Sequence, residues 1–444
     1  MQKLEKKYGL LSAVCMVTGS VIGSGIFFKA ELISRVTGAD ARIGSIAWIV
    51  GGCVMLSCLL VFSFLAQKHE DASGLSDYCG ILVGKRYGYF VGWFMATVYF
   101  PTLVSVLAWL SARYTLLCLG HTEQDGGLCM LLASVYLALS YCQNILFPSF
   151  SGKLQVITTF IKLIPLALMI IFGTAKGIDS GMLSTNFSVY GNQGALGFFS
   201  AVVSSLFAYE GWIGAASIGA ELKNSKKNLP RALLLGGSIV TAVYLLYFIG
   251  ISGAVNSHIF LNHPGEGIRI AFSNALGENF ASALTAFVAV SCFGALNATM
   301  FCSVRAMYSV AKTGQGPLPR LFSQIDSESG MPSSSGVAGL GASMAWLFFY
   351  YGAKISPTPL FSGYGFDSSE LPIVSIYAMY IPLFLMYIRK SSDGYMKRFL
   401  LAPLAVISCL FMVFCAVYSH RAEIINYLAA FTAIMLFGAV FEKK

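Results

Sequence analysis

Long apolar stretches recur along almost the whole chain, and they limit what it can fold into. An α-helix needs about 20 mostly apolar residues to cross the roughly 30 Å hydrocarbon layer of a membrane. About twelve such stretches follow one another here, separated by short charged breaks. In lipid each backbone polar group must be hydrogen-bonded within the protein, so these stretches are predicted to be helices. The pattern predicts an all-α integral membrane protein.

The apolar stretches set the predicted boundaries of the spans. They are Leu10–Val36, Ile43–Leu65, Gly88–Leu119, Leu128–Phe147, Leu154–Gly173, Ala195–Leu222, Ala232–Val255, Phe280–Val310, Val337–Tyr351, Ile373–Ile388, Phe399–Tyr418 and Ile424–Phe441. Gly265–Gly277 is predicted to be a short amphipathic surface helix. The apolar character never drops for long enough to mark a soluble module, so residues 1–444 are predicted to form one membrane domain.

Composition and charge agree with a membrane protein. Hydrophobic residues make up 56% of the chain and charged residues only 11%, which excludes a soluble globular protein. Basic residues gather beside spans at Lys85–Arg86, 223–231 and 389–398, and the positive-inside rule then places both termini in the cytoplasm. The net charge of +9 is assigned to the anionic leaflet rather than to a nucleic acid. The expected location is the cell membrane, which is the inner membrane in a Gram-negative source.

Residues that would indicate an enzyme or a metal site are scattered. The eleven cysteines lie mostly within apolar spans without a CxxC pair, and the five histidines fall at span ends or in loops. We therefore expect no catalytic residue, metal or cofactor, and no enzyme activity. Cys118 and Cys129 flank one predicted outer loop, and whether they pair is left open.

The first span contains a glycine- and serine-rich motif, Gly19-Ser-Val-Ile-Gly-Ser-Gly-Ile-Phe27, at its middle. Glycine so placed destabilises a helix. A break within the membrane is tolerated where it lines a cavity or meets a ligand, and amides at the start of the next half-helix suit a carboxylate. Gly19 and Gly23 also fit a small-residue helix contact. The motif alone leaves both interpretations open.

A second motif, Phe207-Ala-Tyr-Glu-Gly-Trp212, places Glu210 inside the sixth span. A carboxylate within a membrane is costly and indicates a functional site by default. The alternative is that Glu210 pairs within the helix bundle and has a structural role.

The two motifs occupy equivalent positions in successive sets of five spans. Inverted-repeat transporters bind their substrate at the midplane, between discontinuous helices from corresponding positions of each half. We therefore predict a five-plus-five inverted repeat in which the first and sixth spans are discontinuous. The first repeat covers about residues 10–173 and the second about 195–388, followed by two extra helices at about 399–441.

The chain resembles the amino acid, polyamine and organocation transporters, in particular the L-type amino acid transporter branch and its bacterial relatives. Four motifs carry the resemblance: Gly23–Phe27, Leu206–Trp212, Glu221–Arg231 and Ser291-Cys-Phe-Gly-Ala-Leu-Asn297. It implies a LeuT-like fold and sodium-independent transport, often as exchange of one amino acid for another. It also implies that the substrate is an amino acid and that the protein is surrounded by the lipid bilayer.

The resemblance further implies roles for individual residues. Phe207 would be the gate, and Lys162 would sit where sodium-dependent relatives bind sodium, although a lysine can also snorkel to an interface. The substrate-binding set would be Val21, Gly23, Ser24, Gly25, Phe207, Ala208 and Glu210, with amides near Ser24 and Gly25 for the carboxylate and carbonyls of Val21, Phe207, Ala208 and Glu210 for the ammonium.

Two residues depart from the L-type pattern. Glu210 stands where glycine is typical, and Ile213 stands where asparagine is frequent. The resemblance leads us to expect an exchanger of neutral L-amino acids. The carboxylate of Glu210 favours the alternative, which is proton coupling or a cationic amino acid or polyamine substrate. The short loops and tails predict no obligatory partner subunit. A membrane enzyme would need histidine, aspartate or cysteine clustered at the membrane surface, and no such cluster is visible in the sequence. A sensor would carry an appended soluble domain, for which both tails are expected to be too short.

Overall fold

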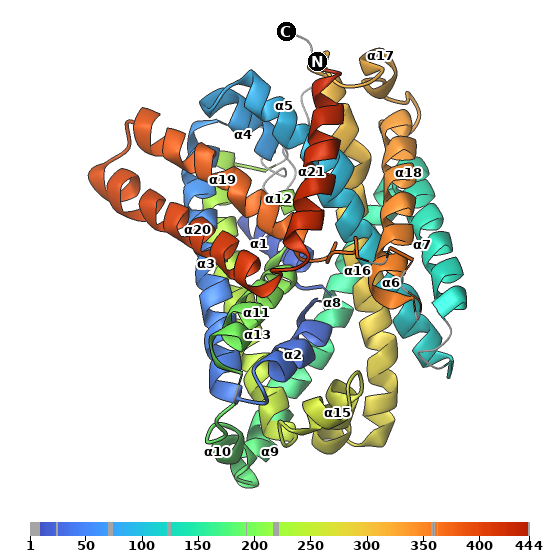
Figure 1. Cartoon of the computed structure of the whole chain (residues 1–444), viewed down its shortest axis with the longest axis vertical. Helices are drawn as coiled ribbons and strands as arrows, with labels where there is room; N and C mark the ends of the chain where they lie inside the picture. The colour runs from blue at the N-terminus through green and yellow to red at the C-terminus, as the bar shows by residue number, and fades with distance from the viewer. Residues whose placement is uncertain are drawn as a thin grey trace.

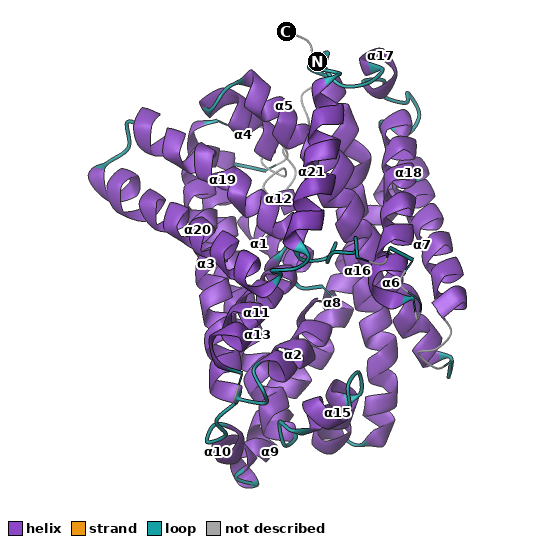
Figure 2. Ribbon diagram, in the orientation of Figure 1, coloured by secondary structure: helices purple, strands orange, loops and turns teal. Residues whose placement is uncertain are grey.

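The computed structural model describes residues 9–442 except 24, 70–73, 122–125, 192, 216–221, 357, 359 and 362, and omits the side chains of 149, 152, 153, 155, 156, 214 and 215. All regular secondary structure in these described residues is helical (Figure 2). The all-α prediction is confirmed.

Helices occupy the first half of the chain almost without interruption, and several continue into short π-helical segments labelled η. The elements are α1 (Leu10–Val21), α2 (Gly25–Val36), α3 (Ala41–Lys68), α4 (Leu75–Leu82), α5 (Lys85–Phe94), η1 (Met95–Tyr99), α6 (Phe100–Cys118), α7 (Gly126–Leu146), α8 (Pro148–Leu168), η2 (Met169–Gly173), α9 (Thr174–Asp179) and α10 (Met182–Asn186).

The second half follows the same pattern. Its elements are α11 (Gly194–Tyr209), α12 (Trp212–Ala215), α13 (Ser225–Ala254), α14 (Ile259–Asn262), α15 (Gly267–Leu276), α16 (Glu278–Ala311), α17 (Pro319–Phe322), α18 (Ser333–Tyr350), η4 (Tyr351–Ile355), α19 (Leu371–Lys390), η5 (Met396–Leu401), α20 (Ala402–Ser419) and α21 (Ile424–Ala439). The surface helix expected at Gly265–Gly277 is present as α15.

Every predicted span contains helix, although not every one has the length and composition of a complete crossing. In the described part of the chain eight helical segments are long and apolar enough to span a membrane, and α1 and α2 together make a ninth. The other three predicted spans contain α11 and α21, with 16 residues each, and α18, which opens with three serines and carries three glycines. The sixth span is short because its helix ends at a break.

Figure 1 shows the helices arranged between two ends of an elongated body. Helices α4, α5 and α17 lie at one end, here called the α17 end, and α9, α10 and α15 lie at the opposite one, the α15 end. Helix α13 packs against α3 and α1, and α16 packs against α6 and α8. Helices α19 and α20 form a hairpin that projects to one side.

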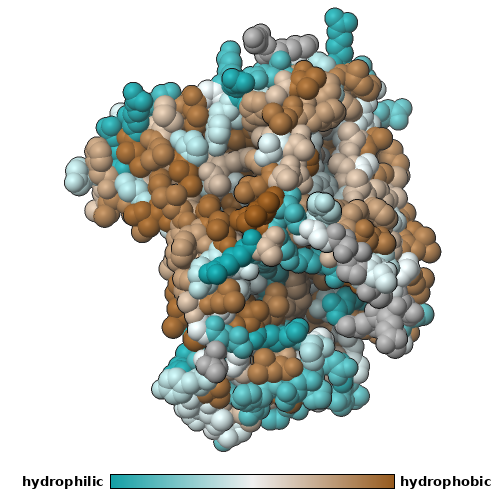
Figure 3. All heavy atoms as spheres, viewed as in Figure 1, coloured by the Kyte–Doolittle hydropathy of each residue, from teal (hydrophilic) through white to brown (hydrophobic). Residues whose placement is uncertain are grey.

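The flanks of the body are apolar, as a lipid-facing surface requires. Figure 3 shows brown, hydrophobic residues over the projecting hairpin and along the opposite flank, with hydrophilic residues gathered at the α15 end and across the centre of this face. Exposed side chains on α20 include Ile407, Leu410 and Phe414. In a water-soluble protein, large apolar side chains such as these would be expected to lie in the interior. Their exposure here fits a surface covered by lipid.

Candidate functional site

The first predicted break is present at the glycine-rich motif. Helix α1 ends at Val21, Ile22 has an extended backbone, and α2 begins at Gly25 at an angle of 47° to α1. Ser24 lies outside the described residues. Gly25 packs directly on the other broken span, because a Cβ added to it would lie 2.7 Å from the Cα atom of Ala208. The motif therefore provides both a break and a close helix contact.

The second break follows the same logic in the sixth span. Helix α11 ends at Tyr209, Glu210 is extended, and α12 begins at Trp212. Gly211 between them has φ +113°, a left-handed conformation that favours glycine. A Cβ on Gly211 would lie 2.5 Å from the carbonyl oxygen of Ser20. The two broken helices thus contact each other at their breaks.

Tyr244 of α13 connects the two breaks through its hydroxyl group. This hydroxyl lies 3.0 Å from the carbonyl oxygen of Val21 and 3.0 Å from that of Ala208, so it can donate to either. Both carbonyls are at helix ends, where no intrahelical amide is available to them. Sequence reasoning missed Tyr244, since a tyrosine in an apolar span is usually a packing residue; its only signal was a polar group within the predicted membrane interior.

Lys162 of α8 contacts the first broken helix from the side. Its side chain is fully buried, and Nζ donates to the carbonyl oxygen of Gly19 near the end of α1. A fully buried ammonium does not fit the alternative of snorkelling to an interface. The lysine places its terminal amino group at carbonyls near a helix C-terminus, which is a favourable place for a cation.

Glu210, at the second break, lies in a buried polar cluster. Its Oε1 atom accepts a hydrogen bond from the Tyr99 hydroxyl of η1, whereas its Oε2 atom has no partner among the described atoms. Tyr380 of α19 is a buried neighbour whose hydroxyl also lacks a described partner. The hydrogen bond from Tyr99 fits the structural alternative, and the unpartnered oxygen fits the functional one.

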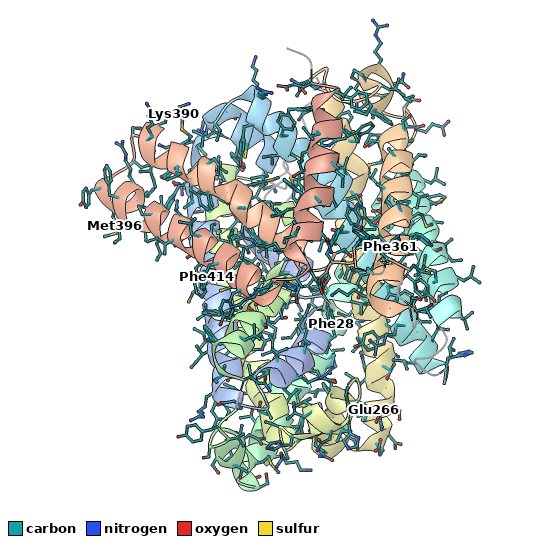
Figure 4. All side chains as sticks on the ribbon, viewed as in Figure 1. Phe28, Glu266, Phe361, Lys390, Met396 and Phe414 are labelled. Carbon is teal, nitrogen blue, oxygen red and sulfur yellow. The ribbon has the colours of Figure 1, made fainter. Side chains whose placement is uncertain are left out.

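Phe207 lies two residues before the end of α11. It is buried, and its ring meets Phe28 of α2 edge-to-face with centroids 5.2 Å apart. Figure 4 shows Phe28 near the middle of the molecule, well away from Glu266 at the α15 end. The Nζ atom of Lys29 lies 5.0 Å from the centre of the Phe207 ring, within the range of a cation–π contact.

A buried ion network, which sequence reasoning missed, lies directly beside Phe207. Lys29 pairs with Oε1 of Glu370, the residue before α19, and that oxygen also accepts from Ser204 Oγ at 2.8 Å. The other oxygen, Oε2, lies 3.1 Å from Nε2 of His420 in the α20–α21 turn. The available signal was that Lys29 is charged within an apolar span; its partner is 341 residues away in the sequence.

The cysteine pairing that the sequence left open is not formed. Both cysteines are free thiols; Cys118 is exposed, whereas Cys129 is buried with its Sγ atom 3.8 Å from the carbonyl oxygen of Trp109. Cys58 of α3 and Cys409 of α20 are instead close, with their Sγ atoms 3.7 Å apart.

A bundle of apolar helices with two broken helices in contact defines a secondary membrane transporter. The amino acid permease family model matches residues 8–440, and the chain belongs to that family. It is 27% identical over 393 residues to the serine/threonine exchanger SteT of Bacillus subtilis (strain 168), a match that covers 88% of this chain and 85% of SteT.

Mammalian relatives match over a smaller share of their length. The human large neutral amino acids transporter small subunit 2 is 29% identical, covering 72% of this chain and 60% of the relative. The human cystine/glutamate transporter is 26% identical, covering 73% and 64%. Among solved structures, MhsT in complex with L-phenylalanine superposes with a TM-score of 0.61 at 13% identity, covering 94% of this chain and all of MhsT. This likeness confirms the LeuT-like fold.

Proposed function

We propose that the chain is a sodium-independent exchanger of neutral L-amino acids that binds its substrate at the contact between the two broken helices. The observation that carries this proposal is the pair of breaks joined by Tyr244, with the start of α2 and the ends of α1 and α11 brought together. Amides at the start of α2 would hold the substrate carboxylate. Carbonyls at the ends of α1 and α11 would hold its ammonium.

The roles of individual residues follow from this arrangement. Ser24 and Gly25 provide the carboxylate-binding amides, and Gly23 lets the chain turn close to Ala295, whose Cβ would lie 3.0 Å from a Cβ on Gly23. Val21 and the residues that end α11 provide the carbonyls. The full set is the one the sequence predicts: Val21, Gly23, Ser24, Gly25, Phe207, Ala208 and Glu210.

Sodium independence is supported by the place of Lys162. Its Nζ atom donates a hydrogen bond to the carbonyl oxygen of Gly19. A backbone carbonyl at the end of α1 is the kind of ligand that a sodium ion would need there. The Lys162 side chain is covalently attached and stays on the protein throughout the cycle. It would therefore satisfy this carbonyl without coupling transport to a sodium gradient. Exchange is supported by the similarity to SteT, a serine/threonine exchanger.

Alternating access would move α1, α2, α11 and α12 relative to the other helices. Phe207 would close over the occupied site, and the empty carrier would change state slowly because the amides at the start of α2 would lack a carboxylate. We place the α17 end in the cytoplasm with both termini, in the cell membrane. The repeats would comprise residues 10–173 and 195–388, with α20 and α21 outside them. No obligatory partner subunit is part of this proposal.

Glu210 supports a second candidate function. An ionised carboxylate held only by neutral hydrogen bonds, with no ion-pair partner among the described residues, is expensive in a dry interior. A proton, or a cationic substrate such as a basic amino acid or polyamine, would supply the missing compensation. This alternative predicts proton-coupled uptake or a preference for arginine.

The test is uptake by purified protein in proteoliposomes without sodium. Vesicles preloaded with a mixture of amino acids are compared with empty ones, using labelled alanine, serine, leucine and arginine separately. Uptake that requires preloading supports exchange, and the favoured label identifies the accepted side chain. Accumulation in empty vesicles only under an inward proton gradient would overturn exchange. In that case Glu210→Gln should remove the pH dependence, with Glu266→Gln at the α15 end as the matched control.

A further inference from the structure

The ion network beside Phe207 joins four separate parts of the fold. Lys29 belongs to α2, Ser204 to α11, Glu370 precedes α19, and His420 lies in the α20–α21 turn. Glu370 is 6% exposed and Lys29 is 3% exposed, so the central pair is screened from water. The pair ties both broken spans to α19, which belongs to the part of the protein against which they would move.

A buried pair of this kind holds the four parts together firmly. Separating two buried charges without replacing their partners is strongly unfavourable. Glu370 uses both oxygens, one for Lys29 and Ser204 and the other for His420. Helices α2 and α11 therefore cannot move away from α19 until Lys29 and Ser204 release Glu370. Since Lys29 also covers the Phe207 ring, the same release is needed before Phe207 can move.

His420 stands between this buried pair and the surface. Its side chain is 15% exposed and borders a surface pocket formed by Leu196 and residues 418–423. One ring nitrogen faces Glu370, and the other, Nδ1, lies 3.9 Å from Glu423. A proton from the surrounding water can thus reach a group that contacts the pair directly.

We propose that the Lys29–Glu370–His420 network is a proton-sensitive latch, in which protonation of His420 holds the pathway shut at Phe207 and deprotonation eases its opening. A protonated His420 places a second positive charge on Glu370, opposite Lys29. A neutral His420 leaves a weaker hydrogen bond. The inference rests on the proposed transport function, because a latch regulates movement only if the protein cycles.

The charged groups that act most strongly on His420 are acidic and favour the protonated imidazole. Glu370 contacts it, Asp367 lies in the segment before α19, and Glu423 lies in the next turn, where Lys354 also pairs with Glu423. Burial by itself lowers the pKa of His420, but the hydrogen bond and charge of Glu370, followed by the charges of Asp367 and Glu423, outweigh it and leave the pKa raised. The latch is therefore tightest at acidic pH and loosens as pH rises through this value.

The test is amino acid exchange by proteoliposomes at equal internal and external pH, measured between about pH 5.5 and 8.5, the range in which histidine titrates. Three proteins are compared: wild type, His420→Gln and His258→Gln. Glutamine at 420 keeps a donor for Glu370 but cannot titrate, and His258, an exposed histidine just before α14 that is not part of the network, serves as the control. We expect wild-type and His258→Gln exchange to slow several-fold toward acidic pH, and His420→Gln to lack this slowing.

Thermal unfolding in detergent provides a readout that does not need transport. A raised pKa in the folded state means that the stabilisation by His420 is fully present at acidic pH and is lost as pH rises through that pKa. The melting temperature of wild type should therefore exceed that of His420→Gln most at acidic pH, and the difference should shrink at alkaline pH.

Three outcomes would overturn the latch: an unchanged pH profile in His420→Gln, a His420-dependent acceleration at acidic pH, or a melting difference that grows with pH. Absence of exchange by the wild-type protein at every pH would instead overturn the proposed function. The melting difference would still decide whether protonation of His420 tightens the network. Glu370→Gln, which removes the charge that holds both cations, should also abolish the acid slowing.

Discussion

Replacing Tyr244 with phenylalanine tests whether the two breaks depend on one hydroxyl group. Tyr244 is fully buried, and its hydroxyl lies 3.0 Å from each of the carbonyl oxygens of Val21 and Ala208. The substitution conserves ring packing, so it leaves no cavity comparable to a lost side chain. It does leave a buried carbonyl without its donor, which costs about 1–3 kcal/mol.

The same helix offers a matched control. Tyr247 lies one turn further along α13, is also fully buried, and its hydroxyl has no described hydrogen-bond partner. Removing that hydroxyl removes an unsatisfied polar atom, so Tyr247→Phe should be neutral or stabilising. Tyr244→Phe should therefore be less stable than Tyr247→Phe by about 1–3 kcal/mol.

The assay is unfolding of both purified variants in the same detergent, followed by exchange measured over a range of substrate concentrations. Tyr244→Phe should melt at the lower temperature and show a higher KM, because the carbonyls proposed to hold the substrate ammonium lose the group that positions them. Equal melting temperatures and equal KM values for the two variants would refute the role given to Tyr244.

Three further predictions follow from other contacts. Lys162→Met should lower exchange by about tenfold or more, because a charge-assisted hydrogen bond worth about 1.5–3 kcal/mol is lost at the end of α1; uptake assays without sodium measure this. The pKa of Asp393, in the α19–η5 loop, is lowered: its burial raises the pKa, but hydrogen bonds including one from Lys68, 3.0 Å away, outweigh it. Asp393→Asn should therefore have a lower melting temperature than wild type at neutral pH, and this difference in melting temperature should vanish as pH falls through the lowered pKa. A lower melting temperature of Asp393→Asn that persists at acidic pH would contradict this. A membrane-permeable oxidant should join Cys58 to Cys409 in a disulfide, and mass spectrometry after thiol labelling should then find two fewer labelled thiols. In Cys58→Ser, oxidation should cause no such loss at Cys409.

The sequence by itself determined the membrane environment, the helical class and the place of both breaks. Span length follows from the thickness of the bilayer, and a glycine-rich motif or an intramembrane glutamate is costly enough there to be visible without any contact information. For that reason Gly25, Gly211 and Glu210 could all be located before their surroundings were known. The boundaries of complete spans were less certain, since α11 ends where the chain breaks rather than where apolar residues stop.

Only the tertiary structure decided which polar groups meet. Tyr244 contacts carbonyls that are 223 and 36 residues away, and Lys29 pairs with Glu370 across 341 residues. Neither tyrosine nor lysine carries a local pattern that names such a partner. In an apolar interior a polar side chain must find a partner somewhere, so the sequence determined that partners were needed. The packing of helices determined which residues they are.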